Sequence, residues 1–146
     1  MKILLHPDPM LNRISALVGA DEDVSQLVAD MFCALYETDG IGLSAIQIGV
    51  AKRIFVIDLH VQGTIPYVFI NPDIVFRSEE KITINEGCLS VPGYYKDVER
   101  SNKIILEAND TYGHTGNSRF SMQLVGLHAV CAQHEMDHLN GITLLA

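Results

Sequence analysis

Residues 124–141 read LVGLHAVCAQHEMDHLNG, and this stretch decides how the chain can fold. We interpret Leu124–Leu139 as one helix, which Asn140-Gly141 ends because glycine can adopt the left-handed C-cap conformation. The helix carries His134-Glu135-Met136-Asp137-His138, so two histidines lie four residues apart on one face. Two imidazoles at this spacing can bind one metal ion, with the intervening glutamate as general base. The competing interpretation, a polar helix face that happens to hold two histidines, is disfavoured by the complete motif.

The sequence upstream predicts an α+β domain. Apolar residues from Val24 to Tyr36 recur at helical spacing behind an acidic start, which predicts an amphipathic helix with Cys33 in its buried face. The chain then continues in short β-rich runs separated by glycine, proline and asparagine: Arg53–Leu59, Tyr67–Ile70, Asp73–Phe76, Lys81–Ile84, Lys103–Ala108 and Ser118–Gln123. A helix, a mostly antiparallel sheet and a second helix are typical of an α+β fold. We expect one domain, residues 1–146.

Composition narrows the class of protein. Hydrophobic residues make up 48% of the chain, and the formal net charge is −8. This charge disfavours direct binding of nucleic acid, and no apolar run reaches the ~20 residues that a membrane span needs. The three cysteines cannot all pair, and His6-Pro7 interrupts the apolar N-terminus before a signal peptide forms. We therefore expect a soluble intracellular protein without a disulfide framework.

A catalytic metal site normally has three protein ligands, so a third donor is required. Only eight residues follow His138, and none is His, Cys, Asp or Glu, so we expect the third ligand upstream. Cys131 lies about two turns, roughly 10 Å of helix rise, from His138, which is too far to share the ion. His128 points elsewhere on the helix, and His114 lies in a glycine-rich turn. The remaining candidate is Cys88, in Glu86–Ser90 after a strand end; taken alone, it is equally well a ligand or a buried structural thiol.

A third feature is the glycine-rich stretch Gly40–Gln47, GIGLSAIQ. It lacks the length and setting of a dinucleotide-binding fingerprint. Its small residues would let a substrate backbone approach closely, and Gln47 could donate its amide to an oxyanion. By itself, however, the stretch is better explained as an ordinary turn between a helix and a strand.

Taken together, the three stretches resemble the motifs of peptide deformylases, which remove the N-formyl group from nascent polypeptides. The family motifs G-φ-G-φ-A-A-x-Q, E-G-C-φ-S and H-E-x-D-H correspond in order to Gly40–Gln47, Glu86–Ser90 and His134–His138. The resemblance implies that Cys88, His134 and His138 bind a divalent metal and that Glu135 is the acid/base residue. It also implies iron(II), with zinc, nickel or cobalt as possible substitutes.

The same resemblance assigns the groups around the metal. Gln47 and the backbone N–H of Leu89 would stabilise the oxyanion, and Glu86 and Arg100 resemble the charge pair that braces the second motif. The implied substrate is an N-formyl-methionyl peptide, in the cytoplasm of a bacterium or of a host cell if the chain is phage-encoded. Its methionine pocket and backbone contacts would come from Ile41, Gly42, Gly87, Leu127, Val130, Cys131 and His134.

Two departures from the family pattern affect these expectations. Ser44 replaces the usual first alanine of motif one, and we expect mild tuning of the oxyanion neighbourhood. The chain also ends soon after the third motif, as in compact and phage-encoded members, so we expect weak, salt-sensitive ribosome association. The alternatives are a non-catalytic deformylase-like metal-binding protein and an amidase of the same scaffold with another acyl substrate.

Overall fold

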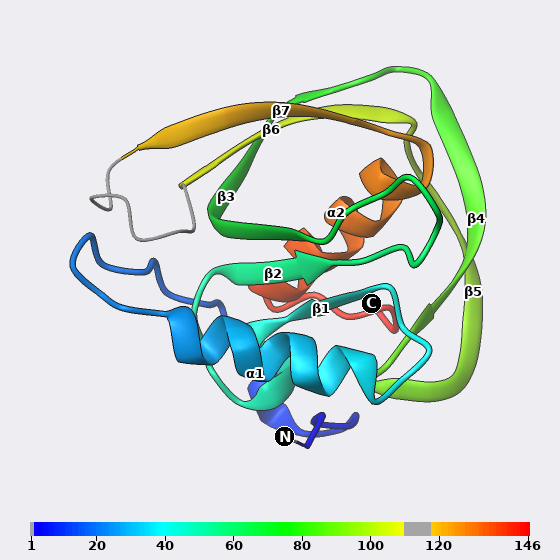
Figure 1. The fold of residues 1–146 in the computed structure, drawn as a ribbon. Helices are drawn as coiled ribbons and strands as arrows, with labels where there is room; N and C mark the ends of the chain where they lie inside the picture. The colour runs from blue at the N-terminus through cyan, green and yellow to red at the C-terminus, as the bar shows by residue number, and fades with distance from the viewer. Residues whose placement is uncertain (1, 110–117) are drawn as a thin grey trace.

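The α+β fold is confirmed in the computed structural model, which describes residues 2–109 and 118–146. The elements, with 3-10 turns written as η, follow one another along the chain as shown in Figure 1. In order they are η1 Pro9–Asn12, α1 Ser25–Tyr36, β1 Gly42–Ser44, η2 Ala45–Ile48, β2 Ile54–Ile57, β3 Tyr67–Arg77, β4 Lys81–Cys88, β5 Val91–Ser101, β6 Lys103–Asn109, β7 Arg119–Val125 and α2 Gly126–Leu139.

Within residues 2–109 and 118–146, the strands form two antiparallel sheets. A five-stranded sheet has the order β1-β2-β3-β6-β7, and β4 and β5 form a separate two-stranded hairpin. The hairpin stands beside α2 at the edge of the molecule in Figure 1. The first strand of the hairpin, β4, ends at Cys88, so the hairpin carries the second motif to the side of the helix that holds the third.

The core has two layers, one on each face of β2. All four residues of this strand are buried, and Phe55 and Ile57 pack with α2 whereas Ile54 and Val56 pack with α1. Since side chains alternate along a strand, α1 and α2 cover opposite faces of the sheet. In Figure 1, β1 and β2 lie between the two helices. This packing fixes α2, and with it the H-E-x-x-H motif, against the sheet.

Several strand boundaries differ from the sequence expectation. The runs 67–70 and 73–76 belong to one strand, because Asn71-Pro72 forms a bulge, with Asn71 at φ 50°, and not a break. Leu124 and Val125 end β7, and α2 begins only at Gly126, whose φ of 60° turns the chain from strand to helix. Strand β5 was missed because most of its side chains are exposed, which leaves no apolar alternation to detect.

Two other expectations were wrong. The stretch 40–47 is not a plain turn: it forms the edge strand β1 and the single turn η2. Cys33 is exposed, because the buried face of α1 is formed by Met31, Ala34 and Leu35, and residue 33 lies outside this face.

Candidate active site

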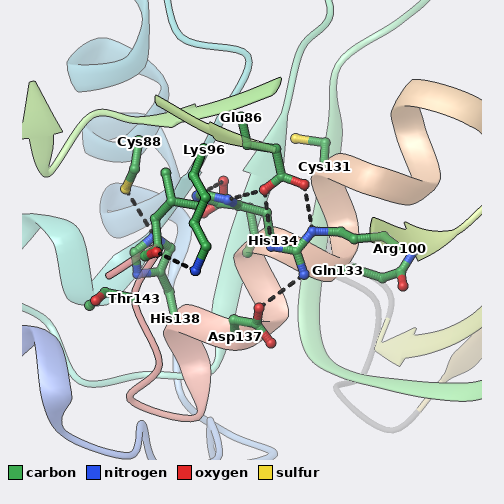
Figure 2. A network of polar contacts seen from close by, with 12 residues as sticks. Glu86, Cys88, Lys96, Arg100, Cys131, Gln133, His134, Asp137, His138 and Thr143 are labelled. Atoms are coloured by element: carbon green, nitrogen blue, oxygen red, sulfur yellow. Dashed lines mark hydrogen bonds and ion pairs between the residues drawn. The ribbon is translucent and has the colours of Figure 1, made fainter. Parts of the chain in front are cut away.

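Three donor side chains from two distant segments converge beside α2. The Sγ of Cys88 and one ring nitrogen each of His134 and His138 all lie within 4.8 Å of one another. Cys88 ends β4, and the two histidines lie one turn apart in α2. The Sγ of Cys88 is 3.3 Å from His138 Nε2, a contact that Figure 2 shows as a dashed line. The structure thus brings Cys88 beside two histidines, the farther of which, His138, lies 50 positions away in the sequence.

Glu86 sets the orientation of one imidazole. Its Oε1 lies 2.9 Å from Nδ1 of His134, which leaves the Nε2 of that ring facing the site. A second-sphere carboxylate of this kind fixes the ring and increases the basicity of a metal-binding histidine. The carboxylate itself stays charged: burial raises the pKa of Glu86, but hydrogen bonds with His134 and Arg100 outweigh this effect and hold it below its usual range.

Arg100 connects this carboxylate to α2. Its Nε and Nη2 donate to the two oxygens of Glu86 at 2.6 and 3.0 Å, and its Nη1 donates to Asp137 at 3.0 Å. The charge pair expected from the sequence is therefore present, and Figure 2 shows Asp137 as a further partner that the sequence did not indicate. Because Asp137 lies between the two histidines of the motif, this bond connects the β4–β5 hairpin directly to the turn of α2 that carries both histidines.

The imidazoles of His134 and His138 have very different pKa values. Burial lowers the pKa of His134, but hydrogen bonds with Cys88 and Glu86 outweigh this effect and raise it to about 10. Burial, reinforced by the charges of His134 and Arg100, lowers the pKa of His138 to about 3. Among the three donors, His134 is thus the one that holds a proton, and a metal ion bound by His134 would displace that proton.

Glu135 is the carboxylate next to this cluster. It is only 3% exposed, its Oε2 lies 4.0 Å from His134 Nε2, and its buried Oε1 has no hydrogen-bond partner among the described residues. Burial raises its pKa to about 7, although the charges of His134 and Arg100 oppose the shift. A carboxyl with a pKa near neutrality and an unpaired oxygen is suited to exchange protons with water.

Gln47 lies next to Cys88 in this cluster. It lies in η2 and is 1% exposed, and its Nε2 donates to Ser90 Oγ at 3.1 Å and lies 3.7 Å from Cys88 Sγ. Residues 4 and 6 join the two loops: the N–H of Leu4 donates to the Gln47 carbonyl at 2.7 Å, and the N–H of His6 donates to the Ser90 carbonyl at 2.8 Å. Sequence patterns gave no sign of this connection.

A cavity of about 550 Å³ opens over these groups. Every residue expected to contact the substrate lines it: Ile41, Gly42, Gly87, Leu127, Val130, Cys131 and His134, together with Gln47, Cys88, Leu89 and Glu135. Tyr94 and Tyr95 of β5 also line it, and sequence reasoning missed them with the strand that carries them. The cavity therefore presents an apolar wall from α2 that leads to the polar cluster.

Cys131 and His128, the other candidate ligands in the described part of the chain, are not members of the three-donor cluster. Cys131 lines the cavity wall, and its pKa is raised well above the usual thiol value by burial and by the charges of Glu135 and Glu86, so it stays a neutral thiol. His128 packs edge-on against Tyr67, with ring centroids 5.5 Å apart. His114 lies outside the described residues.

The donor set fits a divalent transition metal. One thiolate and two imidazoles favour iron, cobalt, nickel or zinc and disfavour magnesium and calcium, which prefer oxygen ligands. Three protein donors also leave positions for water and substrate, as in catalytic sites. Placed at the end of a cavity beside a buried carboxylate, they define the class of metal-dependent hydrolases.

Comparisons with known proteins identify the family. The sequence model described as Polypeptide deformylase matches residues 1–146. The peptide deformylase of Cellvibrio japonicus is 47% identical over 142 residues, which cover 97% of this chain and 82% of that protein. The solved peptide deformylase of a Vibrio parahaemolyticus bacteriophage, in complex with actinonin, has a TM-score of 0.88 at 40% identity and covers 99% of this chain and 100% of that one. The peptide deformylase of Legionella pneumophila has a TM-score of 0.88 at 41% identity, with coverages of 99% and 83%.

The chain belongs to the polypeptide deformylase family, so it is a metal-dependent hydrolase that removes the N-formyl group from newly made polypeptides. Neither α1, α2 nor any other helix in the described part of the chain has the length and apolar content to cross a bilayer.

Proposed function

We propose that Cys88, His134 and His138 hold the metal ion of this deformylase and that Glu135 is its acid/base residue. The observation that carries the proposal is the meeting of the three donors within 4.8 Å beside the unpaired buried oxygen of Glu135. A bound divalent ion would supply a Lewis acid that polarises the formyl carbonyl and lowers the pKa of water. The thiolate and imidazole donors are compatible with iron(II), zinc, nickel and cobalt alike. Membership of the deformylase family favours iron(II), with the other three metals able to replace it.

The cavity would hold the formylated methionine. Its side chain would lie against Leu127, Val130 and Cys131, while the small residues Gly42 and Gly87 would let the substrate backbone come close. Binding of this kind places the formyl carbon at the polar end of the cavity and excludes bulk water from it.

Proton transfer would fall to Glu135. Its carboxylate accepts a proton from water, the water oxygen bonds to the formyl carbon, and the Nε2 of Gln47 and the N–H of Leu89 donate to the developing oxyanion. One donor of this type contributes about 3–4 kcal/mol in other hydrolases. Glu135 then delivers the proton to the amide nitrogen as the C–N bond breaks, which releases formate and a free N-terminal amine.

The alternatives have less support. A non-catalytic binding protein would not require Glu135, Gln47 and Cys88 to be present and to meet in one site. An amidase for another acyl group differs only in the substrate, so a direct test separates the two. After anaerobic loading with iron(II), the protein should release formate from formyl-Met-Ala and leave acetyl-Met-Ala intact. Comparable hydrolysis of both peptides would favour the amidase, and hydrolysis of neither would refute the proposal.

The net charge affects whether the enzyme meets its substrate on the ribosome. We place it in the cytoplasm in which formylated chains are made, and we expect weak, salt-sensitive contact with ribosomes because the net charge of −8 opposes binding to RNA phosphates.

A further inference from the structure

Ser44 and Gln47 make an unusually complete set of mutual hydrogen bonds. Ser44 is fully buried, ends β1 and caps η2. Its hydroxyl faces the backbone N–H of Gln47 in the arrangement of a capping box. In the other direction, its backbone N–H and its hydroxyl lie 3.0 and 3.1 Å from Gln47 Oε1. Both ends of the serine are therefore engaged with the same glutamine.

These contacts fix which end of the Gln47 amide faces the active site. A backbone N–H can only donate, so the atom 3.0 Å from it must be the amide oxygen. The Nε2 then points the other way, toward Ser90 Oγ and Cys88 Sγ. A rotation of 180° about the last side-chain bond would turn the oxygen toward Cys88 Sγ and toward the oxyanion of the proposed reaction, which it would repel.

The capping role alone does not account for the hydroxyl. A cap requires only that the serine oxygen accept the N–H of Gln47. The contact with Oε1 adds a second donor to an oxygen that the N–H of residue 44 already holds. An alanine at this position, as in the family motif, would keep the N–H and lose the hydroxyl.

We propose that the hydroxyl of Ser44 is a positioning group for the reaction, which holds the Gln47 amide with its N–H₂ toward the oxyanion. The inference rests on the proposed role of Gln47. Ser44 itself is not among the described residues that line the cavity, so it acts through Gln47 and does not touch substrate.

Ser44→Ala tests the proposal. We expect kcat for formyl-Met-Ala to fall about 3- to 10-fold, the range for the loss of one hydrogen bond, with KM almost unchanged. Ser15→Ala is the matched control, because Ser15 is also buried but its hydroxyl has no partner among the described residues. Equal kcat values for the two variants would overturn the proposal.

A double-mutant cycle separates positioning from a structural effect. In a Gln47→Ala background, Ser44→Ala should cause no further loss of kcat, because the group that it positions is gone. An equal loss in both backgrounds would show that the hydroxyl acts on something else.

The second readout does not depend on turnover. In the zinc-loaded protein, the side-chain NH₂ protons of Gln47 should exchange with solvent several-fold faster in Ser44→Ala than in Ser15→Ala, as followed by NMR. Unchanged exchange would refute the positioning role. An inactive wild type whose Gln47 NH₂ protons still exchange slowly would instead refute the proposed function. It would leave the positioning of the Gln47 amide by Ser44 intact.

Discussion

Gly42→Ala should displace Glu135, the proposed acid/base residue, without contacting any of the three proposed metal ligands. Gly42 begins β1 and faces the wall of α2. A methyl carbon added there would lie 2.7 Å from Cys131 Sγ and 2.8 Å from Glu135 Oε2. Contacts between such atoms are normally about 3.5–4.0 Å, so either the strand or both side chains must move by about 1 Å.

The size of the effect follows from this displacement. Forcing an extra carbon into a well-packed wall costs about 1–3 kcal/mol of unfolding free energy. The cost in rate is larger, since a misplacement of about 1 Å in a catalytic constellation can lower turnover about 100-fold. We therefore expect kcat for formyl-Met-Ala to fall about 100-fold while the metal content stays at the wild-type level.

The control variant replaces a second glycine, at a position where the methyl group of alanine fits without a clash. Gly19 is exposed, and an added methyl carbon would meet only ordinary contacts of 3.8 and 3.9 Å with Glu22, so Gly19→Ala is the control. Formate release, metal content and thermal unfolding are measured on each variant. A Gly42→Ala enzyme with wild-type kcat would show that the carboxylate does not need its observed position, and the reasoning would fail.

Two further variants test the ligand set and the fold. Cys88→Ser should lower the affinity for zinc, since a hydroxyl is a much poorer anionic donor than a thiolate, whereas Cys33→Ser should leave it unchanged; chelator competition measures both. Tyr36 donates to Asp58 at 2.6 Å, and this bond lowers the pKa of that carboxyl, so it stabilises the fold above about pH 4 and the gain is lost as the pH falls through the folded-state pKa. Tyr36→Phe should therefore cost about 1 kcal/mol at pH 7 and progressively less as the pH falls through the folded-state pKa of Asp58, as read from urea unfolding. A cost that does not change with pH would refute this explanation.

The sequence could predict those parts of the site whose residues lie close together along the chain. Residues 134 and 138 share a helix face by periodicity alone, so their pairing follows from the chain itself. The position of Cys88 beside them does not, because the β4–β5 hairpin reaches α2 through long-range contacts such as that of Arg100 with Asp137. Here only the resemblance to a family selected the thiolate.

Exposure explains the remaining failures. Strand β5 is largely solvent-facing, so its side chains carry no apolar alternation, and Tyr94 and Tyr95 were missed with it. Cys33 looked like a core residue because cysteine is often buried, yet the face of α1 that packs on the sheet runs through Met31, Ala34 and Leu35. The residue type predicted that Cys33 is buried, but its position on α1 places it outside the buried face.

The most direct test of the account is the rate of formate release by Glu135→Gln, compared with the wild type at equal content of the same metal. The amide keeps the shape of the side chain but cannot accept a proton from water, so kcat for formyl-Met-Ala should fall by about 10²- to 10⁴-fold. A Glu135→Gln enzyme that holds its metal and turns over at the wild-type rate would contradict the account.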